Sequence, residues 1–152
     1  FQLSDFNNHL LKHYHSIPAQ GKCSLSIHTS WYGEVLWDYH QMLQVFMNLI
    51  ENALDALGKK GKIIITISSN NEEELEVCVH DTGPGIPKEI RSKIFDLFFT
   101  TKADRTGIGL YIVQLIIYEH GGVISLKDDE RGATFIIRIP KKIEIHRKGP
   151  FS

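Results

Sequence analysis

The stretch NLIENALDAL, residues 48–57, has the apolar periodicity of an amphipathic helix with an unusual polar face. At about 100° per residue, one side of this helix is apolar and the opposite side carries Asn48, Glu51, Asn52 and Asp55. A face that meets only solvent normally carries Lys, Glu or Gln, because Asn competes for backbone hydrogen bonds and lowers helix propensity. Two amides four residues apart can instead present oxygens to a hard cation. The stretch therefore predicts a helix with either a solvated face or part of a ligand site.

Length and composition indicate one globular domain over residues 1–152, with a helix within 1–20 and a tail at 141–152. A chain of this size buries roughly two-thirds of its unfolded surface. Hydrophobic residues make up 42% of the chain and the net charge is −1, which argues against disorder. No apolar run is long enough to span a bilayer. The near-neutral charge gives no reason to expect nucleic acid as a partner, so we expect a soluble domain without one.

The two cysteines, Cys23 and Cys78, lie far apart and neither belongs to a CxxC pair, so we expect no zinc site and no disulfide. This usage favours a reducing compartment, and we expect a cytoplasmic location. Residues 1–15 are polar and rich in histidine, whereas a signal peptide needs an apolar core. The absence of an initial methionine favours a piece of a longer protein. Whether that parent is anchored to a membrane is left open by the sequence.

The alternation of apolar and polar residues predicts four helices and five strands. Helices are expected over 4–17, 38–57, 88–99 and 108–120. Strands are expected within 23–38, which includes a hairpin-like turn near Gly33, over 62–69 and 75–81, and as a closing hairpin over 123–140. This order favours an α/β two-layer sandwich, with one mixed, mostly antiparallel sheet of about five strands packed against about three helices. A doubly wound parallel fold fits the order less well.

Capping residues predict where two of these helices begin and end. Ser4 or Asp5 is expected to cap the first helix. Asp38 and Gln41 form a capping-box pattern at the start of the second helix, and Gly58 should end it. The long amphipathic helix is therefore expected to occupy most of residues 38–57.

The segment DTGPGIP, residues 81–87, directly follows a predicted strand. One interpretation is a tight surface turn, which such residues form routinely. The other is a ligand-binding loop, in which Gly83 and Gly85 let the backbone approach a flat ligand while Asp81 accepts a hydrogen bond from an exocyclic amine. A buried carboxylate would need such a partner. The residues alone leave both interpretations open.

The segment TGIGLYIV, residues 106–113, places two glycines at a helix start, where free N–H groups and the helix dipole favour phosphate. It is not a Rossmann fingerprint, which needs a preceding strand and a third glycine, and no GK[ST] follows as in a Walker A loop. The preceding FFTTK, residues 98–102, adds Lys102 and two hydroxyls, and Arg105 adds a second cation. Because Thr/Lys loops are usually only solvated, this segment by itself does not decide between a phosphate site and a surface loop.

In content and order, these segments resemble the ATP-binding domain of sensor histidine kinases, in the superfamily that also includes DNA gyrase B, Hsp90 and MutL. DYHQMLQVFMNLIENALDAL is similar to the N box, DTGPGIP to the first glycine box, IFDLFFTTK to the phenylalanine box and TGIGLYIV to the second glycine box. EHGGVIS and GATFIIRIP resemble the closing segments. The resemblance covers roughly residues 24–140 and implies the Bergerat-type α/β fold.

The resemblance implies a site for ATP and Mg²⁺ within residues 38–134. It implies that Asn52 coordinates Mg²⁺ bridging the ATP phosphates, that Asn48 supports the same site, and that Asp81 reads the adenine amine. The other implied nucleotide contacts are Gly83, Gly85, Ile86, Thr100, Thr101, Lys102, Gly107, Gly109, Leu110 and Thr134.

The resemblance also implies a lid over residues 99–107, on which Lys102 meets the phosphates. Arg105 stands where the family usually has the first glycine of its second glycine box, so the lid should be stiffer and its guanidinium is available to phosphate. Asn48, Lys102 and Arg105 are the residues implied to act in catalysis. Asp55 stands where many relatives carry Lys or Arg, so phosphate charge must be met elsewhere.

The function that the resemblance implies is that of a histidine kinase catalytic domain, which transfers the γ-phosphoryl group of ATP to a histidine in two-component signal transduction. Its partners would be the phosphoacceptor helical hairpin domain of the same protein, in a dimeric parent, and a response regulator receiver domain. His15 with Pro18 faintly resembles an acceptor pattern. Too few residues follow it before the first strand to form a helical hairpin, so the acceptor is expected upstream of this chain.

Three alternatives stay open. An ATPase clamp of the gyrase or Hsp90 type would carry a water-activating Glu where this chain has Asn48, which disfavours hydrolysis. A serine kinase of the anti-sigma type has similar boxes but phosphorylates a hydroxyl group. A degenerate domain would bind nucleotide only to dock a partner.

Overall fold

The computed structural model describes residues 1–17, 21–100, 107–127 and 131–143. The elements are α1 (Leu3–His15), β1 (Lys22–Thr29), α2 (Tyr39–Leu57), β2 (Lys60–Ser69), β3 (Glu74–Asp81), the 3₁₀ helix η2 (Lys88–Lys93), α3 (Gly109–Glu119), β4 (Val123–Lys127) and β5 (Ala133–Pro140). The predicted order of helices and strands is confirmed. No helix in these described stretches combines the length and the apolar character that crossing a bilayer requires.

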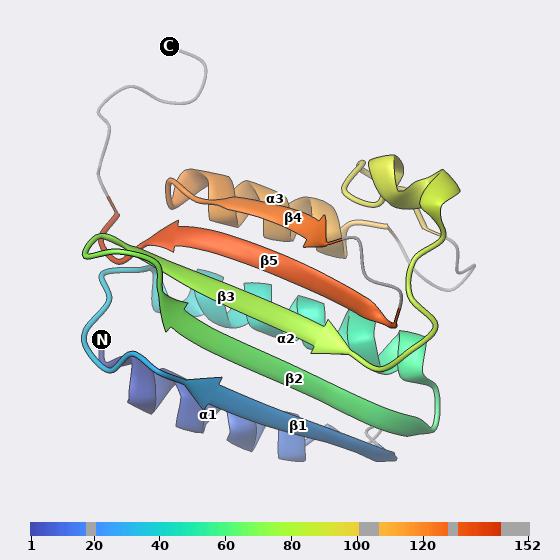
Figure 1. Cartoon of the computed structure of the whole chain (residues 1–152), viewed down its shortest axis with the longest axis horizontal. Coiled ribbons are helices and arrows are strands. Elements are labelled where there is room, and N and C mark those ends of the chain that lie inside the picture. The colour runs from blue at the N-terminus through green and yellow to red at the C-terminus, as the bar shows by residue number, and fades with distance from the viewer. Residues whose placement is uncertain (18–20, 101–106, 128–130, 144–152) are drawn as a thin grey trace.

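The five strands form one sheet in the order β1-β2-β3-β5-β4. β1 and β2 are parallel, with α2 in the crossover between them, and the other neighbours are antiparallel. Figure 1 shows α1, α2 and α3 on the same side of this sheet. The predicted two-layer sandwich with a mixed, mostly antiparallel sheet is therefore confirmed.

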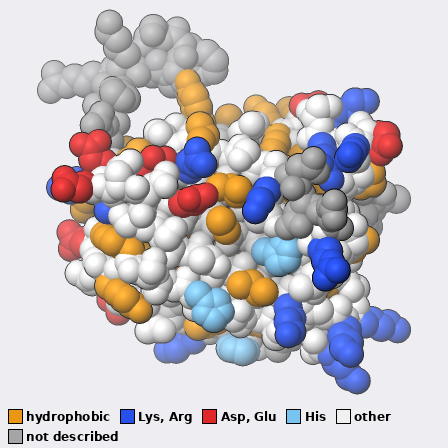
Figure 2. Space-filling model, viewed as in Figure 1, with side chains coloured by type: hydrophobic (Ala, Val, Ile, Leu, Met, Phe, Trp, Pro, Cys, Tyr) orange, Lys and Arg blue, Asp and Glu red, His pale blue; other side chains and the backbone are white. Residues whose placement is uncertain are grey.

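The hydrophobic core lies between the sheet and the helices. Alternate residues of β2 and β3 are buried, among them Ile63, Ile65, Ile67, Leu75, Val77 and Val79. They face the apolar side of α2, which contributes Phe46, Leu49 and Ile50. The opposite face of the sheet is a mixture of polar, charged and scattered apolar side chains (Figure 2). This is the pattern of a sheet with one buried face, and it leaves the polar side of α2 free to form a site.

The start of α2 is fixed by its N-cap and by a distant histidine. The Asp38 carboxylate accepts a hydrogen bond from the Gln41 backbone N–H at 2.8 Å, as the sequence predicts. In a capping box the Asp38 N–H would donate to the Gln41 side chain. Here the Asp38 N–H donates to Nε2 of His120 instead, at 3.1 Å. At the other end, Gly58 has a φ of 70° and ends the helix as expected.

The prediction that Ser4 or Asp5 caps α1 is wrong, because Gln2 is the N-cap and no side chain caps this helix. Gln2 forms an isolated bridge with Glu34, and the Leu3 N–H donates to the Gly33 carbonyl, so the helix begins directly after a tertiary pairing. The strand predicted within 23–38 ends at Thr29, and the residues after it do not return along it as a hairpin.

The helix predicted over 88–99 is a 3₁₀ helix that ends at Lys93. Phe98 has a left-handed backbone with a φ of 65°, and its N–H donates to the Gly107 carbonyl at 3.0 Å. A helix that continued through Phe98 could not make this contact. The segment is therefore tied to the start of α3 instead of completing its own helix.

The end of α3 explains the glycine pair after His120. The Gly122 N–H donates to the Ile117 carbonyl and the Gly121 N–H to the Tyr118 carbonyl, which together form a Schellman motif. Gly121 has a φ of 78°, and a Cβ on Gly122 would lie 2.5 Å from the Arg138 carbonyl oxygen. Both positions therefore need glycine, and they let the chain turn directly into β4.

Candidate functional site

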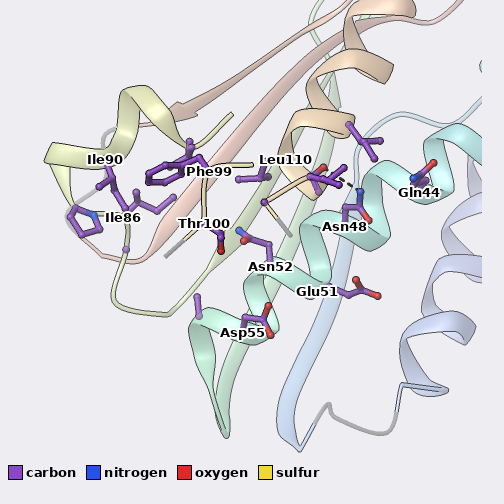
Figure 3. A pocket seen from close by; sticks show the side chains of 18 residues that line it. Gln44, Asn48, Glu51, Asn52, Asp55, Ile86, Ile90, Phe99, Thr100 and Leu110 are labelled. Carbon is purple, nitrogen blue, oxygen red and sulfur yellow. Dashed lines mark hydrogen bonds between the residues drawn. The ribbon is translucent and has the colours of Figure 1, made fainter. Parts of the chain in front are cut away.

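A cavity of about 510 Å³ lies between α2, the segment after β3 and the start of α3 (Figure 3). The first wall comes from α2 and consists of Gln44, Asn48, Glu51, Asn52, Asp55 and Ala56. The second wall consists of Gly85, Ile86, Pro87, Ile90, Ile94, Phe99 and Thr100. The third consists of Gly107, Ile108, Gly109, Leu110 and Ile112. Three segments that are distant in the sequence therefore enclose one space.

The amides of α2 face this cavity. Figure 3 shows Asn52 pointing toward Thr100. The Asn48 side-chain Nδ2 donates to the Gly109 carbonyl oxygen at 3.3 Å, which joins α2 to the first residue of α3. The polar face of the helix thus lines a ligand-sized cavity, which favours the site interpretation over that of a solvated face.

The wall opposite α2 is largely apolar. Ile86, Ile90 and Phe99 approach the cavity from the segment after β3 (Figure 3). Ile86 lies just before η2 and Ile90 lies within it, and both residues line the cavity. A flat apolar group such as a nucleobase could pack on this wall while a polar group reaches the amides of α2.

Glycines shape the two turns at the edge of the cavity. Gly85 has a φ of 80°, and a Cβ there would lie 2.9 Å from the Gly132 carbonyl oxygen. Gly107 has a φ of 70°, and its Cβ would lie 2.5 Å from the carbonyl carbon of Phe98. A Cβ on Gly109 would meet nothing within 4 Å. The first two glycines are needed for the fold itself, whereas Gly109 leaves open space beside the cavity.

Asp81 is buried at the end of β3, with 3% of its surface exposed. Its Oδ1 accepts a hydrogen bond from the Gly83 N–H at 2.9 Å. Burial raises the pKa of this carboxyl group above its ordinary value, and the backbone hydrogen bonds from Gly83 and Ala133 oppose that rise only in part. A buried carboxyl group with a perturbed pKa is a candidate functional group, although Asp81 is not among the residues that line the cavity.

The structure brings together most of the residues predicted for the site. Those that line the cavity are Asn48, Asn52, Gly85, Ile86, Thr100, Gly107, Gly109 and Leu110. Asp81, Gly83 and Thr134 do not line it, and the Thr134 hydroxyl lies 2.7 Å from Nδ1 of His80. Thr101, Lys102 and Arg105 lie outside the described residues. The roles of all these residues in ligand binding stay predictions.

Several lining residues were not predicted for the site, and simple spacing could have found some of them. Gln44 precedes Asn48 by one helical turn, and Glu51 and Asp55 share the polar arc with Asn52. Phe99 gives no such signal, since it lies beyond the end of η2 and its position depends on the tie between Phe98 and Gly107.

The oxygen atoms on the cavity wall suit a hard cation that takes some of its ligands from the protein and the others from a bound molecule. Nowhere in the described ranges do three or more His, Cys, Asp or Glu side chains form a group that could hold a metal. The wall does offer an amide from Asn52 and carboxylates from Glu51 and Asp55. Mg²⁺ commonly uses one or two protein oxygens together with water and phosphate oxygens, so these residues suit Mg²⁺ bound with a phosphorylated ligand.

Comparisons with known proteins agree on one family. The family model described as histidine kinase-, DNA gyrase B- and HSP90-like ATPase matches residues 37–143. The sensory histidine kinase/phosphatase NtrB of Rhizobium leguminosarum bv. phaseoli is 37% identical over 115 residues, which cover 66% of this chain and 30% of NtrB. This chain therefore spans less than a third of the length of that relative.

Solved structures show the same similarity over nearly the whole chain. The catalytic domain of histidine kinase ThkA matches with a TM-score of 0.83 and 36% identity, covering 93% of this chain and 94% of that one. Histidine kinase ThkA in complex with the response regulator protein TrrA matches with a TM-score of 0.76 and 32% identity, covering 96% of this chain and 42% of that one.

Proposed function

This chain belongs to the histidine kinase-, DNA gyrase B- and HSP90-like ATPase family, as a catalytic ATP-binding domain of the sensor histidine kinase type, and we propose that it uses Mg-ATP to phosphorylate a histidine. The acceptor would lie on a helical dimerisation domain of the same, dimeric parent protein. The observation that carries this proposal is the cavity in which the amide face of α2, two glycine turns and an apolar wall meet. The family match spans all three of these walls.

In the proposed complex, the adenine packs on the apolar wall near Ile86 and Ile90. The Asp81 carboxylate accepts a hydrogen bond from the adenine amine, and Gly83 and Gly85 allow the backbone to lie close to the base. The phosphates lie near Gly107 and Gly109, where the first N–H groups of α3 and its dipole favour negative charge. Ile86, Gly107 and Gly109 line the same cavity as Asn52, which supports this orientation.

Catalysis in this proposal consists of positioning and charge neutralisation, as is usual in phosphoryl transfer. Bound Mg²⁺ would neutralise charge on the phosphates, with Asn52 as its protein ligand. Asn48 holds the start of α3 through the Gly109 carbonyl and carries no basic group that could activate water. The acceptor imidazole is itself the nucleophile, so the domain needs no general base. Lys102 and Arg105 are proposed to add positive charge from the lid.

The proposed partners follow from this chemistry. The domain would act on the phosphoacceptor helical hairpin of its own parent, and the phosphorylated histidine would pass its phosphoryl group to a response regulator receiver domain. The ThkA structure in complex with the response regulator TrrA supports this pairing by analogy. ATP as substrate, together with two free cysteines, Cys23 and Cys78, supports a cytoplasmic location.

A labelling experiment tests the proposal against its alternatives. The purified chain is incubated with Mg²⁺ and γ-labelled ATP, with and without candidate helical acceptor domains. We expect slow phosphate release by the chain alone and acid-labile, base-stable label on a histidine of the cognate acceptor. Rapid phosphate release without labelling would favour the ATPase clamp, acid-stable label on a hydroxyl would favour the serine kinase, and binding without either would favour a docking module.

A further inference from the structure

His120, at the C-terminal end of α3, is a buried histidine with both ring nitrogens in hydrogen bonds. Only 2% of its surface is exposed. Nε2 lies 3.1 Å from the Asp38 backbone nitrogen, and Nδ1 lies 2.8 Å from the Ile116 carbonyl oxygen. A backbone N–H can only donate and a carbonyl can only accept, so the ring must be neutral with its proton on Nδ1. One tautomer alone satisfies this environment.

These contacts join the two helices that line the cavity, at the end far from it. Asp38 is the N-cap of α2, so His120 ties the start of α2 to the end of α3. Near the cavity, Asn48 of α2 donates to the Gly109 carbonyl at the start of α3. At 1.5 Å per residue, about 15 Å of α2 and a similar length of α3 separate the two ties. The helices therefore run antiparallel, and α3 is joined to α2 by a hydrogen bond near each of its own ends.

The two ties differ in what a bound ligand would do to them. The bond between Asn48 and Gly109 is 3.3 Å long, and both residues line the cavity, so a ligand at that point competes for the same polar groups. The bond between His120 and Asp38 is remote from the cavity and lies beside a second anchor, in which Trp37 Nε1 donates to the Pro140 carbonyl at 2.7 Å. The remote tie therefore persists when a ligand occupies the cavity.

We propose that His120 is a positioning residue for nucleotide binding: through the Asp38 backbone it holds α2 against α3 and so sets the separation between Asn52 and the backbone of Gly107 and Gly109. His120 itself touches no ligand. Because α2 is one continuous helix, a shift at its N-cap moves Asn48 and Asn52 with it. This inference rests on the proposed function, since it concerns nucleotide held between these two helices.

Two substitutions separate the tie from mere burial. In His120→Gln the side-chain oxygen can reach the place of Nε2 and accept from the Asp38 N–H, while the bond to the Ile116 carbonyl is lost. In His120→Asn the amide nitrogen can take the place of Nδ1 and keep the bond within α3, while the bond to α2 is lost. The control is Ile117→Val, which trims a fully buried side chain of α3 and leaves the tie intact.

Calorimetric titration with Mg-ATP gives the readout, with thermal unfolding measured on the same samples. We expect His120→Gln and Ile117→Val to keep the wild-type affinity and His120→Asn to lose about fivefold to tenfold, which is the effect of one neutral hydrogen bond. Equal affinity of His120→Asn and wild type would overturn the inference, and so would equal losses in His120→Asn and His120→Gln. A wild-type chain that fails to bind Mg-ATP would instead contradict the proposed function.

A measurement on the wild-type protein does not depend on how the variants fold. ¹⁵N NMR of the His120 ring should show a protonated Nδ1 and an unprotonated Nε2, with a hydrogen bond from the Asp38 amide. A ring protonated on Nε2 would refute the tie whether or not the chain binds nucleotide.

Discussion

A methyl group added at Gly107 should disturb both the packing of this turn against Phe98 and the binding of a ligand in the cavity. It has a φ of 70°, and its Cβ would lie 2.5 Å from the Phe98 carbonyl carbon and 2.7 Å from the Phe98 and Phe99 carbonyl oxygens. A left-handed backbone costs a non-glycine residue about 1–2 kcal/mol, and overpacking costs about 1–3 kcal/mol more. We therefore expect Gly107→Ala to lower the free energy of unfolding by about 2–5 kcal/mol, unless the Phe98–Gly107 pairing opens instead.

Opening that pairing would relieve the strain but move Phe99 and Thr100 away from the cavity wall. Either way, Mg-ATP affinity measured by calorimetry should fall, and urea unfolding shows how much of the strain the fold retains. The matched control is Gly109→Ala, where a Cβ meets nothing within 4 Å. At this helical position alanine should leave the stability unchanged or raise it by up to about 1 kcal/mol. Its Mg-ATP affinity should nevertheless fall, because the proposed phosphates approach this backbone.

Gly107→Ala and Gly109→Ala should differ in stability, whereas both should bind Mg-ATP more weakly than the wild type. If Gly107→Ala has wild-type stability and wild-type Mg-ATP affinity, the close packing of Phe98 against Gly107 does not support the site. If Gly109→Ala binds Mg-ATP like the wild type, the nucleotide does not approach α3 at its first residue, and the proposed position of the phosphates is refuted.

Three further substitutions and one control variant test individual roles. Asn52→Ala should abolish Mg²⁺-dependent ATP binding with the fold intact, while Gln44→Ala, on the same wall, should bind Mg-ATP nearly as the wild type does; calorimetry showing equal affinity for Asn52→Ala and wild type would reject the metal role. Asp81→Asn should reduce the preference for ATP over GTP in competition binding. Because burial raises the pKa of Asp81, this group's contribution to stability is complete below its unfolded pKa of about 3.9 and is lost as the pH rises through the folded-state pKa. Asp81→Asn should therefore gain stability relative to wild type with rising pH in urea unfolding, and a pH-independent difference would contradict this. Lys102→Ala should slow single-turnover transfer to the acceptor more than it weakens Mg-ATP binding, since its charge matters most in the transition state; equal effects on both would contradict a catalytic role.

Sequence patterns predicted the helices and strands whose backbone is determined by neighbouring residues. The periodicity of residues 48–57 and the cap at Asp38 predicted α2, and the alternation in β2 and β3 predicted paired strands. The errors arose where a tertiary contact decides the backbone. Gln2 occupies the N-cap position of α1 because it pairs with Glu34, and η2 ends early because the Phe98 N–H reaches the Gly107 carbonyl.

The sequence predicted part of the candidate site, and the fold supplied the rest of the cavity wall. The spacing of the two amides on α2 left a solvated face and a ligand site both open, and nothing in that stretch says which segments face them. The apolar wall around Ile90 and Phe99 comes from the fold. The hydrogen bond between Asp38 and His120 joins residues 82 positions apart, so local sequence patterns cannot predict it. In the sequence, His120 is simply the residue before a pair of glycines, with no signal of its contact with α2.

The charges along α2 bear on which form of the nucleotide this cavity accepts. Glu51 and Asp55 both line it, and among the described lining residues there is no Lys or Arg. At an effective dielectric constant of about 20, a carboxylate about 6 Å from a phosphate charge is repelled by about 3 kcal/mol. A triphosphate brings several such charges, so free ATP would meet strong repulsion on this wall. A divalent cation held by Asn52 together with the phosphates would reverse the sign of the interaction, because the same carboxylates would then attract the complex. For the proposed complex we therefore expect Mg-ATP to bind more tightly than free ATP, and calorimetry showing equal affinity with and without Mg²⁺ would contradict this role of the acidic side of α2.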